Sequence, residues 1–151
     1  MRRFASTVSI ATCSDGARWM GITVTSVASV SMEPAALLVC INRASQFHAA
    51  LRRQPRFCIN FLCQAHAALP DAFAGRAGAP ARFEDGLWRA DGEGPPYLAD
   101  AQANLFCTVD RVFDYATHGI FIGLVEAVRV NPDVAPLIYQ DGAYAGIAAL
   151  K

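Results

Sequence analysis

Short runs of β-branched and apolar residues, each closed by a turn signal, recur along the whole of this sequence. Residues 6–12 and 19–31 alternate small polar and apolar residues on either side of a turn at 14–16, which predicts an opening hairpin. After a break at 32–34, residues 35–42 (AALLVCIN) form a continuous apolar run of strand length. We expect this run to be a central strand that is covered on both faces.

The rest of the chain continues the same pattern. Further strands are expected at 56–62, 104–114, 119–130, 137–139 and 143–148. Two short helices are expected, one at 45–53 with Ser45 as its N-cap and one at 64–73, and the Gly- and Pro-rich stretch 75–96 is expected to be mostly loop. About seven or eight strands with so few helices are typical of a closed or nearly closed antiparallel barrel. We therefore predict a mainly β fold in one domain over 1–151.

Composition narrows the function classes. Basic and acidic residues number 13 each, so the formal net charge is zero and a nucleic-acid partner is not expected. Hydrophobic residues make up 54% and charged residues 17%, which predicts a well-buried core and some surface covered by another subunit. No apolar run approaches the ~20 residues of a membrane helix. The odd number of cysteines, without a C-x-x-C pair, predicts buried free thiols and a cytoplasmic location.

Familiar catalytic and nucleotide-binding motifs are missing from the sequence. It contains no G-x-S-x-G elbow, no H-E-x-x-H, no G-x-G-x-x-G that opens a helix, and no Walker lysine motif. His48, His66 and His118 lie far apart along the chain, so a zinc site is not expected. Any catalytic or binding residues are therefore expected in segments that carry no standard motif.

Two such segments stand out. Hydroxyls gather in the run Thr23-Val24-Thr25-Ser26, where they could hold a phosphate or the polar edge of a flat ring, or could form an ordinary strand face. The segment Asn42-Arg43-Ala44-Ser45 places an arginine beside a helix N-terminus, which is either an anion site or a simple cap with a solvated side chain. For each of the two segments, the residue types alone do not decide between a binding site and a structural role.

The remaining candidates are single residues in turns and loops. His118 lies at a tight turn between two long predicted strands, where a lone histidine is either structural or catalytic. Tyr139 and Tyr144 flank the Asp141-Gly142 turn and could simply pair across a hairpin. Arg82-Phe83 lies in a loop and carries little information alone.

Taken together, the segments resemble the flavin reductase-like family, whose fold is the FMN-binding split barrel. The resemblance rests on the order and spacing of these stretches: RRFASTVSIAT, GITVTSVASVSMEPAALLVCINRASQFH, RFCINFL, ARFEDGLW, ATHGIFIGLVEAV and PLIYQDGAYAGI. Members include reductase components of two-component aromatic hydroxylases and of pyrimidine-degrading oxygenases. The resemblance implies an antiparallel split β-barrel, a homodimer, and an enzyme that uses NADH or NADPH to reduce FMN or FAD for a partner monooxygenase.

The resemblance also implies roles for individual residues. The flavin ring and ribityl chain would be lined by Thr23, Val24, Thr25 and Ser26. The flavin phosphate and, for FAD, the adenine side would be held by Asn42, Arg43, Ser45 and Phe47. Arg82 and Phe83 would close over the flavin, while His118 and Tyr144 would approach the nicotinamide.

One departure from the family pattern concerns the residues before the histidine. The family's Gly-Asp is Ala116-Thr117 here, and a threonine there resembles the pyrimidine-pathway branch. Hydride transfer requires stacked rings rather than a strong acid or base, which agrees with the lack of a carboxylate pair or triad. The main alternative is a non-catalytic flavin- or haem-binding split barrel, which would need no nicotinamide pocket. His118 and Tyr144 favour the reductase.

Overall fold

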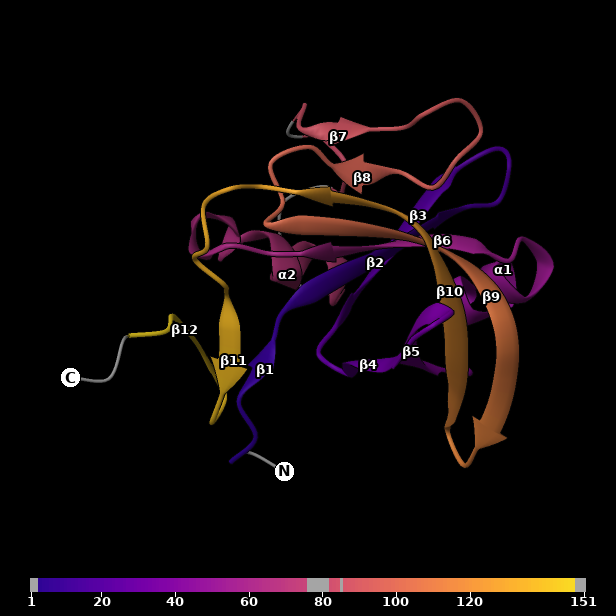
Figure 1. The fold of residues 1–151 in the computed structure, drawn as a ribbon, viewed down its shortest axis with the longest axis horizontal. Coiled ribbons are helices and arrows are strands. Elements are labelled where there is room, and N and C mark those ends of the chain that lie inside the picture. Colours follow the sequence, from indigo (N-terminus) through magenta and orange to yellow (C-terminus); the bar gives the residue numbers. More distant parts are fainter. Residues whose placement is uncertain (1–2, 76–81, 85, 149–151) are drawn as a thin grey trace.

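The computed structural model describes residues 3–75, 82–84 and 86–148 (Figure 1). The strands are β1 (Ser6–Thr7), β2 (Ser9–Ser14), β3 (Trp19–Val24), β4 (Val27–Met32), β5 (Ala35–Asn42), β6 (Arg56–Phe61), β7 (Trp88–Arg89), β8 (Tyr97–Leu98), β9 (Ala103–Tyr115), β10 (His118–Val130), β11 (Ile138–Gln140) and β12 (Ala143–Ala145). The helices are α1 (Gln46–Arg53), a 3₁₀ turn η1 (Gln64–His66) and α2 (Leu69–Phe73). None of the helices in the described ranges is long and apolar enough to cross a membrane.

A seven-stranded antiparallel sheet dominates the fold. Its strand order is β3-β2-β6-β9-β10-β5-β4, so the two edge strands are consecutive in the sequence. Only Thr25 and Ser26 separate the end of β3 from the start of β4. A link of two residues lets the ends of the two strands lie at most about 11 Å apart, whereas strands six places apart in a flat sheet would lie nearly 30 Å apart. The sheet must therefore curl until its edges approach, which confirms the predicted antiparallel split barrel.

The barrel has two hydrophobic clusters. The larger lies inside the curled sheet and beneath α1, with the side chains of Leu37, Val39 and Phe121 among its buried members. The smaller lies under α2 and the C-terminal hairpin β11–β12, around Phe73, Trp88 and Leu98. Because α1 and α2 each bury one apolar face, both helices are held firmly beside the rim of the barrel.

Helix α1 agrees closely with its sequence prediction. The Ser45 hydroxyl oxygen accepts a hydrogen bond from the His48 backbone N–H at 3.1 Å, so Ser45 is the N-cap. Phe47, Ala50 and Leu51 are buried, as their helical spacing predicted. The chain leaves the helix at Gln54, before Pro55.

The opening hairpin, the long β9–β10 pair and the closing hairpin are also confirmed. Residues 19–31 were expected to continue as one run, but the chain crosses the split at 25–26 and forms two strands. The expected helix at 64–73 is a 3₁₀ turn followed by α2. Strand β12 ends at Ala145, earlier than predicted. Within 75–96, the described part includes the short strand β7, while 76–81 and residue 85 lie outside the described residues.

Candidate functional site

A hollow of about 670 Å³ lies at the β3 edge of the barrel. Residues 18–23 form one wall, and the start of α1, the end of α2 and Arg82 form the others. Ligand sites of this size are typical for drug-sized molecules and cofactors. Four residues singled out in the sequence contribute to its lining: Thr23, Ser45, Phe47 and Arg82.

An aromatic cluster forms the floor next to this cavity. The Phe83 ring packs edge-on against Trp19, Phe73 and Trp88, with centroid distances of 5.7, 5.0 and 4.9 Å. Phe83 has φ of 64°, an unusual value for a non-glycine residue, so the cluster holds the backbone in a strained conformation there. The Arg82 Nε–H donates to the Ala72 carbonyl at 2.9 Å. The Arg82-Phe83 pair is therefore fixed against α2 rather than free in a loop.

Gly21 allows β3 to approach α2 closely. A Cβ at this position would lie 2.6 Å from Cε1 and 2.7 Å from Cδ1 of Phe73, and 3.3 Å from Cζ of Phe83. Phe73 is buried and already packs on Trp88. The cavity wall at Gly21 thus has room for a backbone but not for a side chain.

A second hollow, of about 530 Å³, lies on the other side of the α1 N-terminus. Asn42 and Arg43 line it, together with the turn before β10. The Asn42 side-chain oxygen accepts from the Ala44 N–H at 2.9 Å, and the Arg43 guanidinium donates to the Ala116 carbonyl at 3.2 Å. Ala116 has φ of 48°, a left-handed turn conformation. The hollow therefore presents an arginine and an asparagine, which is suited to an anionic group.

Three basic residues, Arg43, His48 and Arg52, and the carboxylate of Asp114 line this second hollow. The Arg52 guanidinium contacts both carboxylate oxygens of Asp114, at 2.7 and 2.8 Å. His48 is 8% exposed, and among the described residues its Nε2 has no hydrogen-bond partner. Burial lowers the pKa of His48, and the positive charges of Arg52 and Arg43 lower it further against the opposing effect of Asp114. The His48 imidazole is thus neutral near pH 7.

His118 adjoins this second hollow. It starts β10, pairs in register with Asn42 on β5, and is exposed. Its Nδ1 lies 2.9 Å from the Thr117 hydroxyl, which fixes the orientation of the ring. The structure therefore brings His118 and the Asn42–Ser45 segment together, although they are distant in sequence.

The hydroxyl-rich segment 23–26 crosses the split of the barrel. The Thr23 hydroxyl donates to the Pro70 carbonyl at 2.6 Å, and Val24 is 6% exposed. The Ser26 hydroxyl donates to the Cys40 carbonyl at 3.1 Å and accepts from the Cys40 N–H at 3.3 Å. Thr25 is exposed beside it. The hydroxyls of Thr23 and Ser26 thus tie the two edges of the sheet to neighbouring backbone.

Tyr144 lies elsewhere. Its hydroxyl donates to the Asp71 carboxylate at 3.1 Å, and its ring packs on Tyr139 at 5.6 Å as the hairpin pairing predicted. In Figure 1 the β11–β12 hairpin and the turn that precedes β10 lie at opposite sides of the molecule. Within one chain, therefore, Tyr144 and His118 do not meet.

Comparison with known proteins shows the family to which this chain belongs. The family model described as "Flavin reductase like domain" matches residues 1–148. This chain belongs to the flavin reductase-like family. The match covers both hollows and the segments around them, so the resemblance inferred from short motifs is confirmed over almost the whole chain.

Named relatives of this family member are reductases. It is 42% identical over 146 residues to the reductase component of an FADH(2)-dependent resorcinol hydroxylase from Rhizobium sp. (strain MTP-10005), covering 95% of this chain and 82% of that relative. It is 36% identical over 144 residues to the FMN reductase (NADH) RutF 1 of Methylorubrum extorquens (strain PA1), covering 95% and 71%.

Solved structures show the same fold. The flavin reductase PheA2 superposes with a TM-score of 0.90 at 27% identity, covering 99% of this chain and 94% of that one. The NADH:FAD oxidoreductase SgcE6 of Streptomyces globisporus C-1027, in complex with NAD and FAD fragments, superposes with a TM-score of 0.86 at 26% identity, covering 97% and 87%.

Several lining residues of the flavin reductase-like chain were not singled out from its sequence. These are Arg18, Trp19, Gly21, Phe73, His48 and Arg52. A tryptophan at the start of a predicted strand is a signal that could have been used for Trp19, whereas its exposure of 42% is known only from the structure. The others resemble ordinary core, turn or surface residues until the fold brings them together.

Proposed function

We propose that this chain is an NAD(P)H-dependent flavin reductase that supplies reduced FMN or FAD to a partner monooxygenase. The observation that carries the proposal is the cavity between β3, α1 and α2, because it joins an aromatic wall to a helix N-terminus. Family membership and the names of the relatives support the same activity.

The residues of the cavity fit a flavin. Trp19, Phe47 and Phe73 offer apolar surface for a flat ring, and Gly21 leaves a wall without side chain. The N-terminal end of α1, at Ser45, carries the positive end of the helix dipole and suits a phosphate. Thr23, Val24, Thr25 and Ser26 would contact the ring and ribityl chain, as the family pattern implies.

The second hollow fits the remaining anionic groups. Asn42 and Arg43 would hold a phosphate there, and Arg82 with Phe83 would cover the flavin from α2. A flavin held by these residues would supply the acceptor for a hydride from NADH or NADPH. We assign the orientation of the nicotinamide to His118, whose ring is fixed by Thr117. Hydride transfer requires no residue to act as a general acid or base. The chain's contribution is to align and enclose the flavin and nicotinamide rings.

We also propose that the reductase is a homodimer. An apolar groove of about 390 Å³ runs along β4, β5, β9 and β10, and it includes Val27, Met32 and Val128. Met32 is 87% exposed and Val128 is 53% exposed. A second copy that covers this groove would remove large apolar side chains from water, in keeping with the high apolar content. In a dimer Tyr144 could reach a nicotinamide site only across the interface.

We further propose a single domain over residues 1–151 and a cytoplasmic location. The five cysteines are all free thiols, which favours a reducing compartment.

Steady-state oxidation of NADH and NADPH, followed by nicotinamide absorbance with and without added FMN, FAD or riboflavin, tests the activity. We expect oxidation that depends on added flavin, and the best pairing identifies both cofactors. Clear flavin binding without oxidation under any pairing would instead establish the non-catalytic binding protein. Sedimentation analysis of the same sample tests the dimer, and a monomeric mass would contradict it.

A further inference from the structure

Helix α2 forms one wall of the proposed flavin cavity, and it is too short to hold its own position. Its last residue, Phe73, lines the cavity together with Ala74, which follows the helix. The helix has five residues, and isolated helices of this length are not stable in water. The shape of the cavity therefore depends on the contacts that α2 makes with the rest of the chain.

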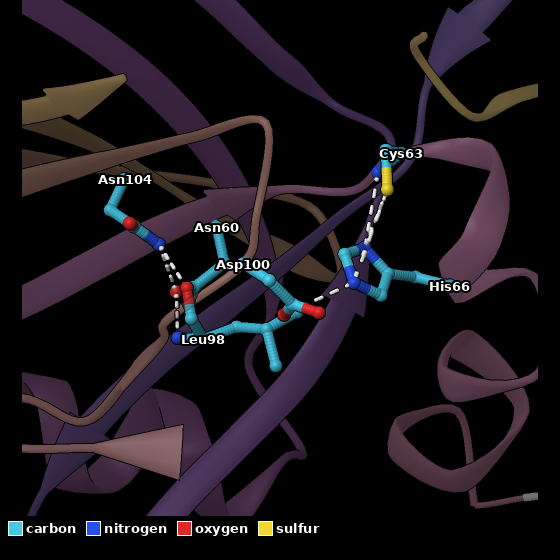
Figure 2. A network of polar contacts seen from close by, with 6 residues as sticks. All are labelled: Asn60, Cys63, His66, Leu98, Asp100 and Asn104. Carbon is cyan, nitrogen blue, oxygen red and sulfur yellow. Dashed lines mark hydrogen bonds and ion pairs between the residues drawn. The ribbon is translucent and has the colours of Figure 1, made fainter. Parts of the chain in front are cut away.

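The chain enters α2 from a fixed point, the 3₁₀ turn η1 (Figure 2). The Nδ1 of the buried His66 accepts a hydrogen bond from the Cys63 backbone N–H at 3.2 Å, and its Nε2 lies 3.2 Å from Oδ1 of Asp100. Asp100 lies in the loop between β8 and β9, and Asn60 on β6 holds this loop by accepting from the Leu98 N–H at 2.9 Å. Because η1 is joined to the core in this way, α2 is held at its N-terminal end.

Two backbone carbonyls of α2 are bound by residues that line the cavity. The Thr23 hydroxyl on β3 donates to the Pro70 carbonyl at 2.6 Å, and the Arg82 Nε–H donates to the Ala72 carbonyl at 2.9 Å. These bonds join α2 to the neighbouring walls. They bind the residues on either side of Asp71, so Asp71 lies at the centre of the segment that is held.

Tyr144 binds α2 at this central residue. Its hydroxyl donates to Oδ1 of Asp71 at 3.1 Å, and its ring packs against the smaller hydrophobic cluster, which includes Phe73. The bond thus joins β12 of the C-terminal hairpin to the helix that carries Phe73. Asp71 and Phe73 are two residues apart in a single helical turn, so a shift of Asp71 moves the Phe73 ring as well.

The C-terminal hairpin also contacts the segment before α2. A Cβ at Gly146 would lie 2.5 Å from Nε2 of the Gln64 side chain in η1. Within the hairpin, Tyr144 pairs with Tyr139 on β11, and their ring centroids lie 5.6 Å apart. The hairpin therefore has a defined position against both η1 and α2, which the Tyr144 hydroxyl transmits to Asp71.

We propose that Tyr144 is a positioning residue for the flavin, because its hydroxyl holds Asp71 and thereby keeps α2 and Phe73 where they fit the flavin ring. The proposal rests on the proposed function, since it takes the ligand of this cavity to be a flavin. It requires no second copy of the chain, because Tyr144 and Asp71 meet within one chain. A wall that is already in place favours binding, since no binding free energy is used to order it.

Equilibrium binding of FMN and FAD to the full chain with Tyr144→Phe tests the proposal. The flavin dissociation constant would be measured from the change in flavin fluorescence, and the KM for NADH from steady-state oxidation. We expect the flavin dissociation constant to rise about fivefold, the loss typical of one hydrogen bond, while the KM for NADH stays unchanged. Tyr139→Phe is a matched control, because it removes the hydroxyl of the neighbouring tyrosine, which makes no hydrogen bond to another described residue. Flavin affinity should not change in this control.

Substitutions of Asp71 separate positioning from general stability. Asp71→Asn keeps an oxygen that accepts from Tyr144, and it should bind flavin within about twofold of the unaltered protein. Asp71→Ala should weaken binding by a factor similar to that of Tyr144→Phe. The double variant Tyr144→Phe/Asp71→Ala should bind no more weakly than Asp71→Ala, because both changes break the same bond. Urea unfolding of each variant without flavin measures the change in stability separately.

Three outcomes would overturn the proposal. Unchanged flavin affinity in Tyr144→Phe, with or without a loss of stability in urea, would show that the hydroxyl serves the fold alone. A higher KM for NADH with unchanged flavin affinity would make Tyr144 a nicotinamide contact that is supplied across a dimer interface. If the unaltered protein binds neither FMN nor FAD, the proposed function itself fails, and the assignment of Tyr144 fails with it.

Discussion

Replacement of Gly21 by alanine probes the closest approach in the proposed flavin cavity. The new Cβ would lie 2.6 Å from Cε1 of Phe73, well inside van der Waals contact. Phe73 cannot swing away freely, because it is 2% exposed and its ring packs against Phe83 and Trp88 at 5.0 and 5.3 Å. The substitution must therefore shift either β3 or α2, both of which line the cavity.

The expected cost follows from the size of this overlap. Extra methyl groups in a packed core cost about 1–3 kcal/mol, and the loss of glycine's chain entropy in a strand returns roughly 0.5–1 kcal/mol. We expect Gly21→Ala to lower the free energy of unfolding by about 1–2 kcal/mol. For a chain of this length the melting temperature should fall by about 2–8 °C. The flavin KM should rise, because the shift of β3 or α2 changes the shape of the cavity that both line.

A double-mutant cycle makes the reasoning refutable. Phe73→Leu removes the ring atoms that the new Cβ would meet, and alone it should cost about 1–2 kcal/mol. In urea unfolding, Gly21→Ala/Phe73→Leu should be more stable than the sum of the single effects by about 1 kcal/mol. Strict additivity of the two single changes would show that the clash at Gly21 is not with Phe73.

Three further predictions concern other parts of the molecule. His118→Ala should mainly weaken NAD(P)H use and spare flavin binding, and unchanged NAD(P)H kinetics would remove that role. Asn60→Ala leaves two buried donors unpaired and should lower the melting temperature by about 6–12 °C, whereas the half-buried turn variant Asn131→Ala should change it by less than about 2 °C. The pKa of His48 in the folded protein is below its ordinary 6.5, so the unfolded chain takes up the proton first and the free energy of unfolding falls as the pH drops through 6.5. The free energy of unfolding of His48→Gln should therefore fall less than that of the unaltered protein between pH 7.5 and pH 5.5.

Much of the fold could be predicted from local patterns. The helix at 46–53 was found because a cap, an apolar face and a stop signal agree, and the β9–β10 hairpin because two long β-rich runs flank one turn. The position of the split was missed, since nothing in the run 19–31 marks the place where the chain leaves one sheet edge for the other. Strand order depends on pairings between distant residues, which periodicity does not report.

The candidate site was predictable only in part, for a similar reason. Thr23 and Ser45 stood out because their segments are unusual for plain structure, and Phe47 was implied by the family resemblance. Gly21 and Phe73 did not, because their importance comes from a contact between β3 and α2 that is distant in sequence. The cysteines were also expected to be more uniformly buried than they are, since Cys40 and Cys63 are half-buried.

The placement of consecutive strands on opposite edges of the sheet also affects how the molecule moves. No ladder joins β3 to β4 within the described ranges, so the barrel can widen along this line without breaking a backbone pair. Thr25 and Ser26 act there as a tether that limits how far the edges separate. Low-energy opening fluctuations should concentrate along this line, while β6 and β9 stay closed at the centre of the sheet. A widening along this line would displace β3, whose residues 19–23 line the cavity between β3, α1 and α2.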